Sequence, residues 1–585
     1  YLLTGMTIAF YDQDHDRVDY VWTRNQSGDI SFTRYFYDDL GNIAFTLSGD
    51  NRETVDAVSG LTVDSVSQLS NSQIETVLTP EMTLAVYDVD DNVIDHTWSM
   101  DEKGDITFTE YHYSQDGILV YTVSAENRNL VEEFDGVSLD TVASLTSDEI
   151  DALLSNGMSL VVYDIDENRI DHVWNRSEDG QTTFTEYHYD GNGDLSFTIS
   201  GEDRAYIESI DSVTVENIGS VDESVIDSVL LSGMSIAVYD RVENRVSHAW
   251  NRSQDGELSY TKYYYDTQGA LVFTVSGPER SVVDNLSSVT VENVHTVTAS
   301  DLAAVLQSGM SIAVYDTEEN RVESVWSRDD AGDITFTAYE YNSAGDLAYT
   351  VSGTNRSDVE NVQGLSAATL SDLRAADIEN ILGAGMSIAV YDTAENRVDY
   401  VWTRDDEDDV VYTRYQYNAD GQIVYTVSGE TRSGVESVTS QLALEDIGTL
   451  QAGDIEAIMQ AGMSCAVYDT DSSRVAYVWS IDDENTVSYT QYNYNQNGQL
   501  AYTITGNSRR DVADVTGISV DTLDEMDAED IDAVLGEDMS IAVYDTDTER
   551  ITYTWSRTDE GTISYTRYYY DPVGTLRFTV SGRSR

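Results

Sequence analysis

Cysteine, apolar runs and basic residues are all scarce in this sequence of 585 residues. The single cysteine, Cys465, excludes an intramolecular disulfide. It stands where other copies of the same segment have Ile312 or Ile388, which indicates a small buried apolar residue. No apolar run approaches the ~18–20 residues of a membrane span, so we expect no membrane insertion within this segment. The chain opens at Tyr1 without an initiator Met or a signal peptide.

Basic residues are far outnumbered by acidic ones. The chain has 31 Lys and Arg against 107 Asp and Glu, a formal net charge of −76, and its only lysines are Lys103 and Lys262. Such a field repels nucleic acid and anionic lipid, which excludes both as expected partners. Abundant acid with almost no lysine is typical of halophilic proteins, although an acidic protein secreted into sea water has a similar composition. We expect a hydrated exterior that attracts cations.

Recognisable catalytic motifs are missing as well. The sequence has no nucleophile elbow, HExxH motif, phosphate-binding loop or Cys/His metal spacing. Three of its seven histidines, His96, His172 and His248, share one repeated position, and other copies place Tyr400 or Ser324 there. A catalytic histidine would not be exchanged in this way from copy to copy. We therefore expect neither an enzyme nor a cofactor.

The sequence does contain eight tandem copies of one segment. A Met opens each copy, and a Trp follows sixteen residues later. The tryptophans, which we expect to be structural core, are Trp22, Trp98, Trp174, Trp250, Trp326, Trp402, Trp479 and Trp555. The predicted repeats are 1–81, 82–157, 158–233, 234–309, 310–385, 386–462, 463–538 and 539–585, the last truncated in its linker.

Four short strands are predicted in each repeat from alternation with period two. In the fifth repeat they span 310–315, 321–327, 333–341 and 346–352, separated by Asp, Asn and Gly clusters typical of hairpin turns. Met310, Ile312 and Trp326 belong to an apolar face, and Thr337 and Tyr339 to a Thr/Tyr face. The pattern predicts a four-stranded antiparallel meander.

About thirty residues join one meander to the next. The stretch 146–157 has a capping box, Thr146 to Glu149, and a closing Gly157, which predicts a short helix. The Val- and Leu-spaced stretch before it fits either a helix or a strand. The apolar face of the helix could cover its own sheet or the next one. A 76-residue unit without disulfides is near the lower limit of independent stability, so we expect neighbours to pack together.

The fold class expected is therefore mainly β with short helices, a linear tandem array of eight units of ~76 residues. The alternative is an eight-bladed β-propeller. The long, partly helical linkers argue against the propeller, because propeller blades usually follow one another closely. Both ends of the chain fall within a linker and no atypical capping repeat is present, so we interpret the sequence as a window on a longer array.

Calcium is the one metal that the sequence favours. The first turn of most repeats is acidic, and alternate aspartates could offer oxygen ligands to a hard cation. The candidate ligands are Asp12, Asp14, Asp88, Asp90, Asp164, Asp166, Asp469, Asp471, Asp545 and Asp547. No repeat completes the D-x-D-x-D-G loop with a distal Glu, and acidic hairpin turns with diffuse cation screening explain the same residues.

The Thr/Tyr face is the candidate binding surface. Its third strand repeats Tyr-x-Tyr, as in Tyr35 and Tyr37, and the chain has 40 tyrosines. An exposed face would form a regular row of rings able to stack on glycans or pack against another chain. A face covered by the linker would be core. We expect the linker to cover it.

Two segments resemble a known repeat family. The sequences YYYDTQGALVFTVSG (263–277) and YYYDPVGTLRFTVSG (568–582) are similar to the Y-x-Y-D-x-x-G-x-L hairpins of YD-type repeats, found in bacterial cell-surface and shell-forming proteins. The resemblance covers about one fifth of each unit, and the 76-residue period and helical linker depart from the family's shorter repeats. It implies an extracellular, non-catalytic scaffold, and it assigns no site residue.

Repetition provides length and lateral surface, which grow with copy number. We expect a structural protein of the cell surface or extracellular space, a fibre, filament or adhesin shaft that associates with itself or through neighbouring repeats. The alternative is a glycan- or protein-binding module, either a propeller or a lectin-like array.

Overall fold

The computed structural model describes residues 2–583, with the exception of 13, 26–28, 135–136, 330, 363–364, 366, 371–372, 406–407, 471, 517, 524–525, 547, 549, 559–560 and 572–574. The chain divides into two units, Tyr1–Ile334 and Thr335–Arg585. Each unit is described by itself below, and the eight repeats remain a prediction about domain boundaries.

Unit 1 contains strands in groups of four. These are β1 (Thr7–Asp12), β2 (Arg17–Arg24), β3 (Ile30–Tyr37), β4 (Ile43–Gly49), β5 (Met82–Asp88), β6 (Val93–Met100), β7 (Ile106–Tyr113), β8 (Leu119–Ala125), β9 (Ser159–Asp164), β10 (Arg169–Arg176), β11 (Thr182–Tyr189), β12 (Leu195–Gly201), β13 (Ser235–Asp240), β14 (Arg245–Arg252), β15 (Leu258–Tyr265), β16 (Leu271–Gly277), β17 (Ser311–Asp316) and β18 (Arg321–Arg328).

Unit 2 continues the same grouping, and its first strand begins at the last residue of unit 1. The strands are β19 (Ile334–Tyr341), β20 (Leu347–Gly353), β21 (Met386–Asp392), β22 (Arg397–Arg404), β23 (Val410–Tyr417), β24 (Ile423–Gly429), β25 (Ser464–Asp469), β26 (Arg474–Ile481), β27 (Val487–Tyr494), β28 (Leu500–Gly506), β29 (Met539–Asp545), β30 (Arg550–Arg557), β31 (Ile563–Tyr570) and β32 (Leu576–Gly582).

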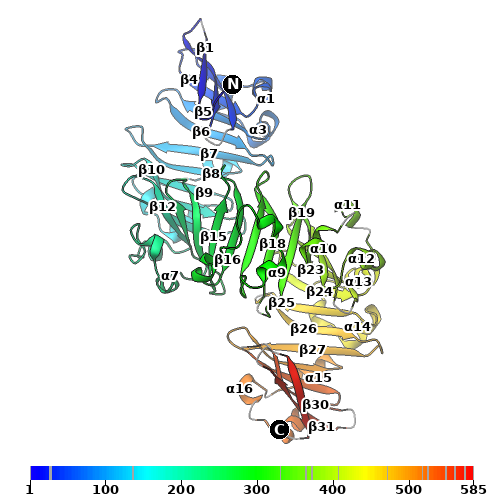
Figure 1. Cartoon of the computed structure of the whole chain (residues 1–585). Coiled ribbons are helices and arrows are strands. Elements are labelled where there is room, and N and C mark those ends of the chain that lie inside the picture. Colours follow the sequence, from blue (N-terminus) through cyan, green and yellow to red (C-terminus); the bar gives the residue numbers. More distant parts are fainter. Residues whose placement is uncertain are drawn as a thin grey trace. The chain divides into compact units, whose positions relative to one another are not determined.

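Within each unit every strand pairs with the next strand in the chain, always antiparallel (Figure 1). The pairing continues across the linkers, because the fourth strand of one meander pairs with the first strand of the next, as β16 does with β17 and β20 with β21. Propeller blades are separate four-stranded sheets. The expected linear array of meanders is therefore confirmed, and the continuous sheet is a feature that the sequence did not predict.

The strands form where the sequence alternates and end where it turns. In the fifth repeat the observed strands β17 to β20 lie within two residues of the predicted ones. The first turn closes on Asn320, whose φ of 48° is left-handed, a conformation that asparagine tolerates better than most residues. The register shifts by one residue between Val314 and Tyr315, a bulge found at the same place in other repeats.

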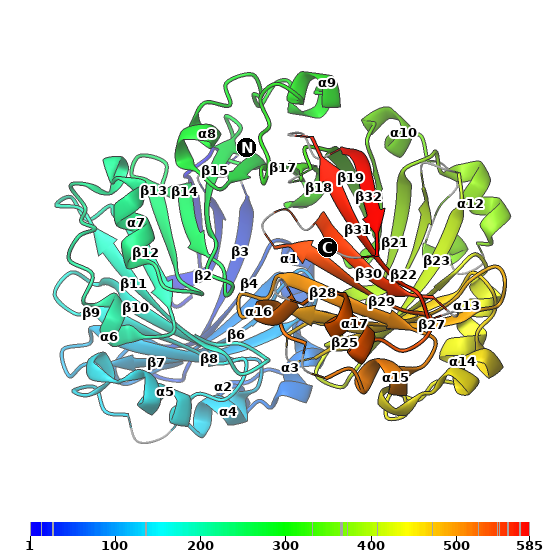
Figure 2. The same cartoon turned by 90° about the horizontal axis from the view of Figure 1, so that it is seen from below.

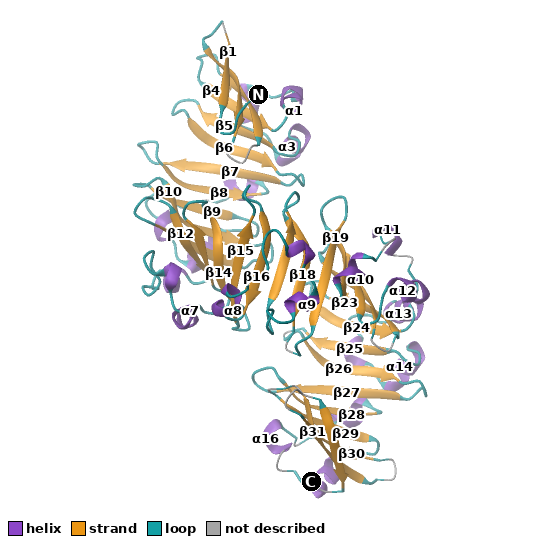
Figure 3. Ribbon diagram, in the orientation of Figure 1, coloured by secondary structure: helices purple, strands orange, loops and turns teal. Residues whose placement is uncertain are grey.

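Short helices occupy the linkers (Figure 3). In unit 1 they are α1 (Arg52–Ala57), α2 (Val63–Val66), α3 (Asn71–Val77), α4 (Arg128–Glu132), η1 (Val142–Ser144), α5 (Ser147–Leu153), α6 (Arg204–Ile207), η2 (Ile218–Ser220), α7 (Glu223–Val229), α8 (Arg280–Asp284), η3 (Val294–Thr296) and α9 (Ala299–Leu302). In unit 2 they are α10 (Arg356–Glu360), α11 (Ala367–Leu370), α12 (Ala375–Ile381), α13 (Arg432–Thr439), η4 (Ile447–Thr449), α14 (Ala452–Ile458), α15 (Arg509–Ala513), α16 (Val520–Leu523) and α17 (Ala528–Val534).

The predicted capping box begins α5. The backbone N–H of Thr146 donates to Oε2 of Glu149 at 2.9 Å, and the N–H of Glu149 donates to Oγ1 of Thr146 at 3.4 Å. The stretch before it, left open between helix and strand, forms the helical turns α4 and η1. The reciprocal bonds between Thr146 and Glu149 satisfy two of the backbone N–H donors that the start of a helix leaves free.

The linkers cover the face of the sheet that carries the tryptophans. Helix α8 packs on β15 and β16 of its own meander, whereas α5 packs on β11 of the following one. Figure 2 shows α5, α6, α7 and α8 on the same side of the strands of unit 1. At Gly277, a Cβ would lie only 3.0 Å from Cγ of Met310 and 3.1 Å from Cγ2 of Val283, so helix, strand and Met meet there without a gap. The core is this layer between sheet and linkers.

Candidate functional site

The acidic first turns close on their own hydrogen bonds. In six of the turns the first aspartate accepts the backbone N–H of the residue two positions later, as Oδ1 of Asp88 does from Asp90 at 2.9 Å. Asp240 makes the same bond with Val242, although that turn has no second aspartate. The same arrangement holds at Asp12 with Asp14 and at Asp164 with Asp166. In this Asx-turn the first carboxylate shapes the backbone without any cation.

Two more of the predicted calcium ligands, Asp469 and Asp545, also accept hydrogen bonds within their own turns. Asp469 accepts a bond from Oγ of Ser472 at 2.9 Å, and Asp545 accepts one from the N–H of Thr548 at 3.0 Å. Asp471 and Asp547 lie outside the described residues. In the part of the chain that the structure describes, no three His, Cys, Asp or Glu side chains come together as a metal site would require. Calcium binding stays a prediction.

The tryptophans lie at the centre of the covered face. Trp250 pairs across the sheet with Ile236 on one side and with Tyr260 on the other, and the two aromatic rings lie 5.2 Å apart. Six further repeats have the same tilted ring pair, with a Phe or Tyr on the third strand. Seven of the tryptophans are fully buried, and Trp22 of the first repeat is half-buried.

The histidines two residues before the Trp are packed into this layer. Nδ1 of His96 lies 2.7 Å from Oδ2 of Asp95, and His172 has the same partner in Asp171. At this position Tyr400 and Tyr477 reach the linker instead, donating to the carbonyls of Leu370 and Ile447 at 2.9 and 2.8 Å. The tyrosines at this position therefore join sheet to linker, whereas the two histidines bond within their own strand.

Buried His248 has Ser247 as the partner of its Nδ1 in place of an aspartate, and burial lowers its pKa to about 4, helped by the positive charge of Arg280. The unfolded chain binds this proton near pH 6.5, so acidification favours unfolding as pH falls from 6.5 toward 4. Between pH 7 and pH 5 we expect the wild-type chain to lose about 2 kcal/mol of its free energy of unfolding through this histidine. The His248→Tyr variant, which has the residue type of Tyr400 and Tyr477, should not show this loss. Urea unfolding of both proteins at the two pH values measures this difference. An equal loss of stability in both would contradict the assignment.

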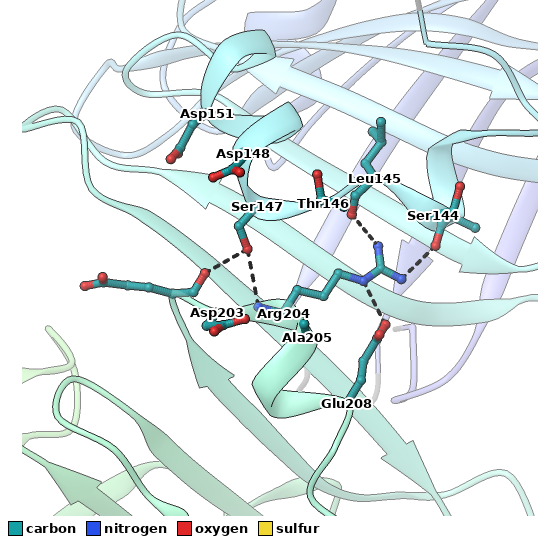
Figure 4. Close-up of a pocket in the computed structure, with 12 residues that line it drawn as sticks. Ser144, Leu145, Thr146, Ser147, Asp148, Asp151, Asp203, Arg204, Ala205 and Glu208 are labelled. Atoms are coloured by element: carbon teal, nitrogen blue, oxygen red, sulfur yellow. Dashed lines mark hydrogen bonds and ion pairs between the residues drawn. The ribbon is translucent and has the colours of Figure 1, made fainter.

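Arginine side chains bridge one linker to the next. Arg204, at the start of α6, donates to the carbonyl oxygens of Leu145 at 2.8 Å and Ala143 at 2.7 Å, and its Nε lies 2.7 Å from Oε1 of Glu208 (Figure 4). Oγ of Ser147 adds a bond to the carbonyl of Glu202 at 3.1 Å. A groove of about 640 Å³ lies along this contact. We call this contact the arginine bridge.

The bridge recurs along the chain. Arg128 donates to Leu69 at 3.1 Å, Arg280 to Gly219 at 3.1 Å and Arg432 to Leu370 at 3.2 Å, in each case to a carbonyl about sixty residues earlier. The arginine bridge was not predicted from the sequence. The signal available was an Arg a few residues after the Gly or Ala that ends each fourth strand, in a chain where basic residues are scarce.

A second set of arginines, at the ends of second strands, binds the last helix of five of the linkers. Arg328, at the end of β18, donates to the carbonyls of Ala303 at 3.0 Å and Leu306 at 2.7 Å. Arg404 and Arg557 make the equivalent pairs with the ends of α12 and α17. A cation there satisfies free carbonyls and is stabilised by the helix dipole. Many of the few arginines in the chain therefore hold the linkers to the sheet.

The Thr/Tyr face lies on the opposite side of the sheet, and the expectation that the linker covers it is wrong. Tyr263 pairs with Thr274, which pairs with Ala313 of the next meander, whereas α8 contacts the face that carries Trp250. The Tyr-x-Tyr side chains of the described strands are half-buried. Burial raises the pKa of Tyr263, which neighbours Tyr239 and Tyr315 of two successive first strands. The tyrosine rows therefore continue across a junction.

The second tyrosine of each pair is fixed in place. The hydroxyl of Tyr265 donates to the carbonyl of Val246 at 2.8 Å, and the guanidinium of Arg245 lies 4.4 Å from its ring centre. The same two contacts fix Tyr37, Tyr189 and Tyr417. This face presents ordered aromatic rings beside Thr and Ser hydroxyls, a chemistry suited to stacking and hydrogen bonding.

Neither Cys465 nor the described helices provide a further candidate site. Cys465 is fully buried, and burial raises the pKa of its thiol to about 12, so the thiol is protonated and unreactive at neutral pH. None of the described helices is long and apolar enough to cross a membrane.

Comparison with known proteins gives no family. No family model and no curated protein matches the chain. Among solved structures it is similar to the crystal structure of TcdB2-TccC3, with 12% identity, a TM-score of 0.16 and coverage of 98% of this chain and 28% of the other. TcdB2-TccC3-TEV gives 10%, 0.18, 98% and 30%. The chain thus spans less than a third of these proteins, and the resemblance to YD-type repeats stays a prediction. On its own architecture, the chain is a tandem-repeat, β-sheet protein.

Proposed function

We propose that this chain is a non-catalytic structural protein of the cell surface or extracellular space, the shaft of a fibre, filament or adhesin. The observation that carries the proposal is the hydrogen-bonded pairing of one meander with the next, present at seven junctions. Each added repeat extends the same sheet, so length grows with copy number. An active site would gain nothing from this repetition.

The arrangement of charge supports the same role. Arginines bind linker carbonyls on the covered face, as Arg204 and Arg328 do, and most carboxylates remain at the surface. Backbone N–H groups donate to turn aspartates such as Asp88 and Asp240, which supports turns that fold through their own hydrogen bonds. A strongly acidic surface keeps such a shaft hydrated and separated from its neighbours.

Stability is expected to increase with ionic strength. A net charge of −76 makes the folded chain repel itself, and salt shortens the Debye length from about 10 Å at 0.1 M to about 3 Å at 1 M. We expect the Tm to rise steadily between 0.05 M and 1 M KCl. Differential scanning calorimetry measures the rise, with sucrose as an uncharged control for preferential exclusion. A Tm that does not change with KCl would contradict the prediction.

Immunogold microscopy of intact source cells tests the proposed location and form. Antibodies against the folded chain should label filaments or the outer surface without permeabilisation, whereas an antibody against a cytoplasmic protein should not. Label that appears only after permeabilisation would overturn the extracellular shaft.

The Thr/Tyr face, which the linkers leave uncovered, favours a second candidate, a glycan-binding array. Its tyrosine rings are fixed by hydrogen bonds and arginine stacking, and such ordering lowers the entropy lost when a sugar ring stacks on them. A glycan array probed with the folded chain tests this candidate, with a Tyr189→Ser, Tyr265→Ser, Tyr417→Ser variant as the control. Absence of any glycan that distinguishes the two proteins would remove it.

A further inference from the structure

The Thr/Tyr face, which the linkers leave uncovered, carries rows of neutral side chains. One row crosses the junction of β12 and β13, and its directly opposite residues are Thr185, Ser200, Ser235, Asn251 and Ser259. The hydroxyls of Thr185 and Ser200 share a hydrogen bond of 2.9 Å. None of the residues in this row is charged, although the chain has 107 Asp and Glu. The row therefore combines small side chains with an uncharged surface.

Two asparagines lie in such rows at equivalent positions of neighbouring repeats. They are Asn175 on β10 and Asn251 on β14, each directly after the buried Trp, and both are exposed. Asn175 lies opposite Ser159 on one side and Thr183 on the other. The other repeats have Ser or Thr at this position, namely Thr23, Ser99, Ser327, Thr403, Ser480 and Ser556. Each asparagine amide is therefore flanked by small hydroxyl residues on the uncovered side of the sheet.

Each of these asparagines begins an Asn-Arg-Ser sequence, at 175–177 and at 251–253. Asn-x-Ser or Asn-x-Thr, where x is not proline, is the acceptor sequence of N-linked glycosylation, and it requires a surface position in a secreted protein. Side chains alternate between the two faces of a strand, so Asn175 and Arg176 point to opposite faces. Arg176 donates to the carbonyl of Asp151 in α5 at 2.9 Å, on the covered face. The asparagine and the serine that follows the arginine are both exposed.

Two further acceptor sequences are bonded into the linkers. Nδ2 of Asn285, at the end of α8, donates to the carbonyl of Ser281 at 2.7 Å. Oδ1 of Asn355 caps α10, accepting the N–H of Ser357 at 3.1 Å and its Oγ at 3.0 Å, so the serine of that sequence is bonded to its own asparagine. The acceptor sequence at Asn25 includes residues outside the described range. The structure thus separates the two strand positions from those in the linkers.

We propose that Asn175 and Asn251 are N-glycosylated, which places sugars on the Thr/Tyr face of two successive repeats. The transfer forms a bond between Nδ2 of the asparagine and the anomeric carbon of a saccharide, and it breaks the bond between that carbon and a phosphate oxygen of a lipid-linked donor. The amide gives up a proton, and the lipid phosphate leaves with the electron pair of the broken bond. The proposal rests on the proposed function, because N-linked sugars are attached to chains that leave the cytoplasm.

Sugars at these two positions add to the hydration of the proposed shaft. Repulsion between chains of charge −76 weakens in salt, because the Debye length falls from about 10 Å at 0.1 M to about 3 Å at 1 M. An attached sugar is bulky and solubilising whether or not salt screens charge. The two sugars therefore keep the neutral rows of the third and fourth repeats hydrated under conditions in which charge repulsion is weak.

Mass spectrometry of peptides from the chain purified from its source cells tests the proposal. We expect the peptides that contain Asn175 and Asn251 to carry a saccharide that chemical deglycosylation removes. Asn175→Ser and Asn251→Ser, made in the same cells, introduce the residue type of Ser327 and should each lose one sugar chain. Asn285→Ser is the matched control, because it removes an acceptor sequence in a linker and should leave the attached sugar unchanged. Unmodified asparagine at both strand positions, or an equal loss of sugar in the control, would overturn the proposal.

A new acceptor sequence at the equivalent position of another repeat tests the role of the strand position. Ser556→Asn on β30 creates Asn-Arg-Thr at 556–558, and this residue also lies between two serines, Ser540 and Ser564. We expect this variant to gain one sugar chain. Ser480→Asn is the control, because Asp482 stands two residues later and no acceptor sequence results. A Ser556→Asn chain without added sugar would contradict the assignment of this position as the glycosylation site.

Immunogold labelling of the same cells separates this proposal from the proposed function. Surface label on a chain whose Asn175 and Asn251 are unmodified would retain the extracellular shaft and reject the glycosylation. Label that appears only after permeabilisation, on a chain with sugar at both positions, would overturn the shaft and retain the glycosylation.

Discussion

Replacing Trp250 by alanine is expected to lower the local free energy of unfolding of its repeat by about 3–5 kcal/mol. Trp250 is fully buried, lies between Ile236 and Tyr260 on the sheet, and is covered by the guanidinium of Arg280 at 5.5 Å. The substitution removes a large apolar area and leaves a cavity between two rigid layers. Because the cavity is bounded by a hydrogen-bonded sheet, little collapse can fill it.

Native-state hydrogen exchange of β14 and β15 measures this loss, since exchange reports local opening in a long repeat protein. The matched control is Trp22→Ala, the same change at the half-buried equivalent in the first repeat. Trp22 has the same ring neighbour, Phe32 at 4.9 Å, but part of its surface already contacts water. We expect a clearly smaller effect there. Equal losses at both positions would mean that burial does not set the contribution of the tryptophan.

The elements of each repeat could be predicted from the sequence because they depend on neighbours close in the chain. Alternation of Ile312, Val314 and Trp326 with polar residues has the period of a strand, and the Asp, Asn and Gly clusters mark turns that local hydrogen bonds then close. The capping box at Thr146 is equally local. For these elements, the few residues that make up the sequence pattern are the same residues whose contacts form the strand, the turn or the start of the helix.

The contacts between repeats could not be predicted in this way. The pairing of Phe273 with Val314 joins residues on two sides of a linker, and alternation within either strand gives no sign of the partner. The same dependence on residues far apart in the chain explains why the linker was wrongly expected to cover the Thr/Tyr face. Both faces of the sheet carry large side chains, and only the position of α8 beside Gly277 decides which one the linker covers. Calcium binding at the first turns stays a prediction for the same reason, because oxygen ligands must be brought together in space.

The arginine bridge also lies beyond sequence reasoning, and its removal is expected to have the second largest effect on stability. Arg204→Met keeps the apolar stem of the side chain but leaves the carbonyls of Leu145 and Ala143 without their donor and Glu208 without its partner. Hydrogen bonds from a charged group contribute about 1.5–3 kcal/mol each, and the part-buried carbonyl of Leu145 adds a cost when it is left unpaired. We expect a loss of about 3 kcal/mol at this contact.

The location of the loss distinguishes a bridge from an ordinary surface arginine. Because Arg204 lies on α6 and its acceptors lie one linker earlier, exchange should increase by about a hundredfold both in α6 and around η1, although only one residue is changed. Arg510→Met is the matched control, since Arg510 is 83% exposed and its nearest partner, Asp514, lies 3.8 Å away; a change below about 0.5 kcal/mol is expected there. In a repeat array, stability is the sum of each repeat and its interfaces with its neighbours. Faster exchange in α6 alone would mean that the strand pairing alone couples the repeats, and that the arginine bridge serves only its own helix.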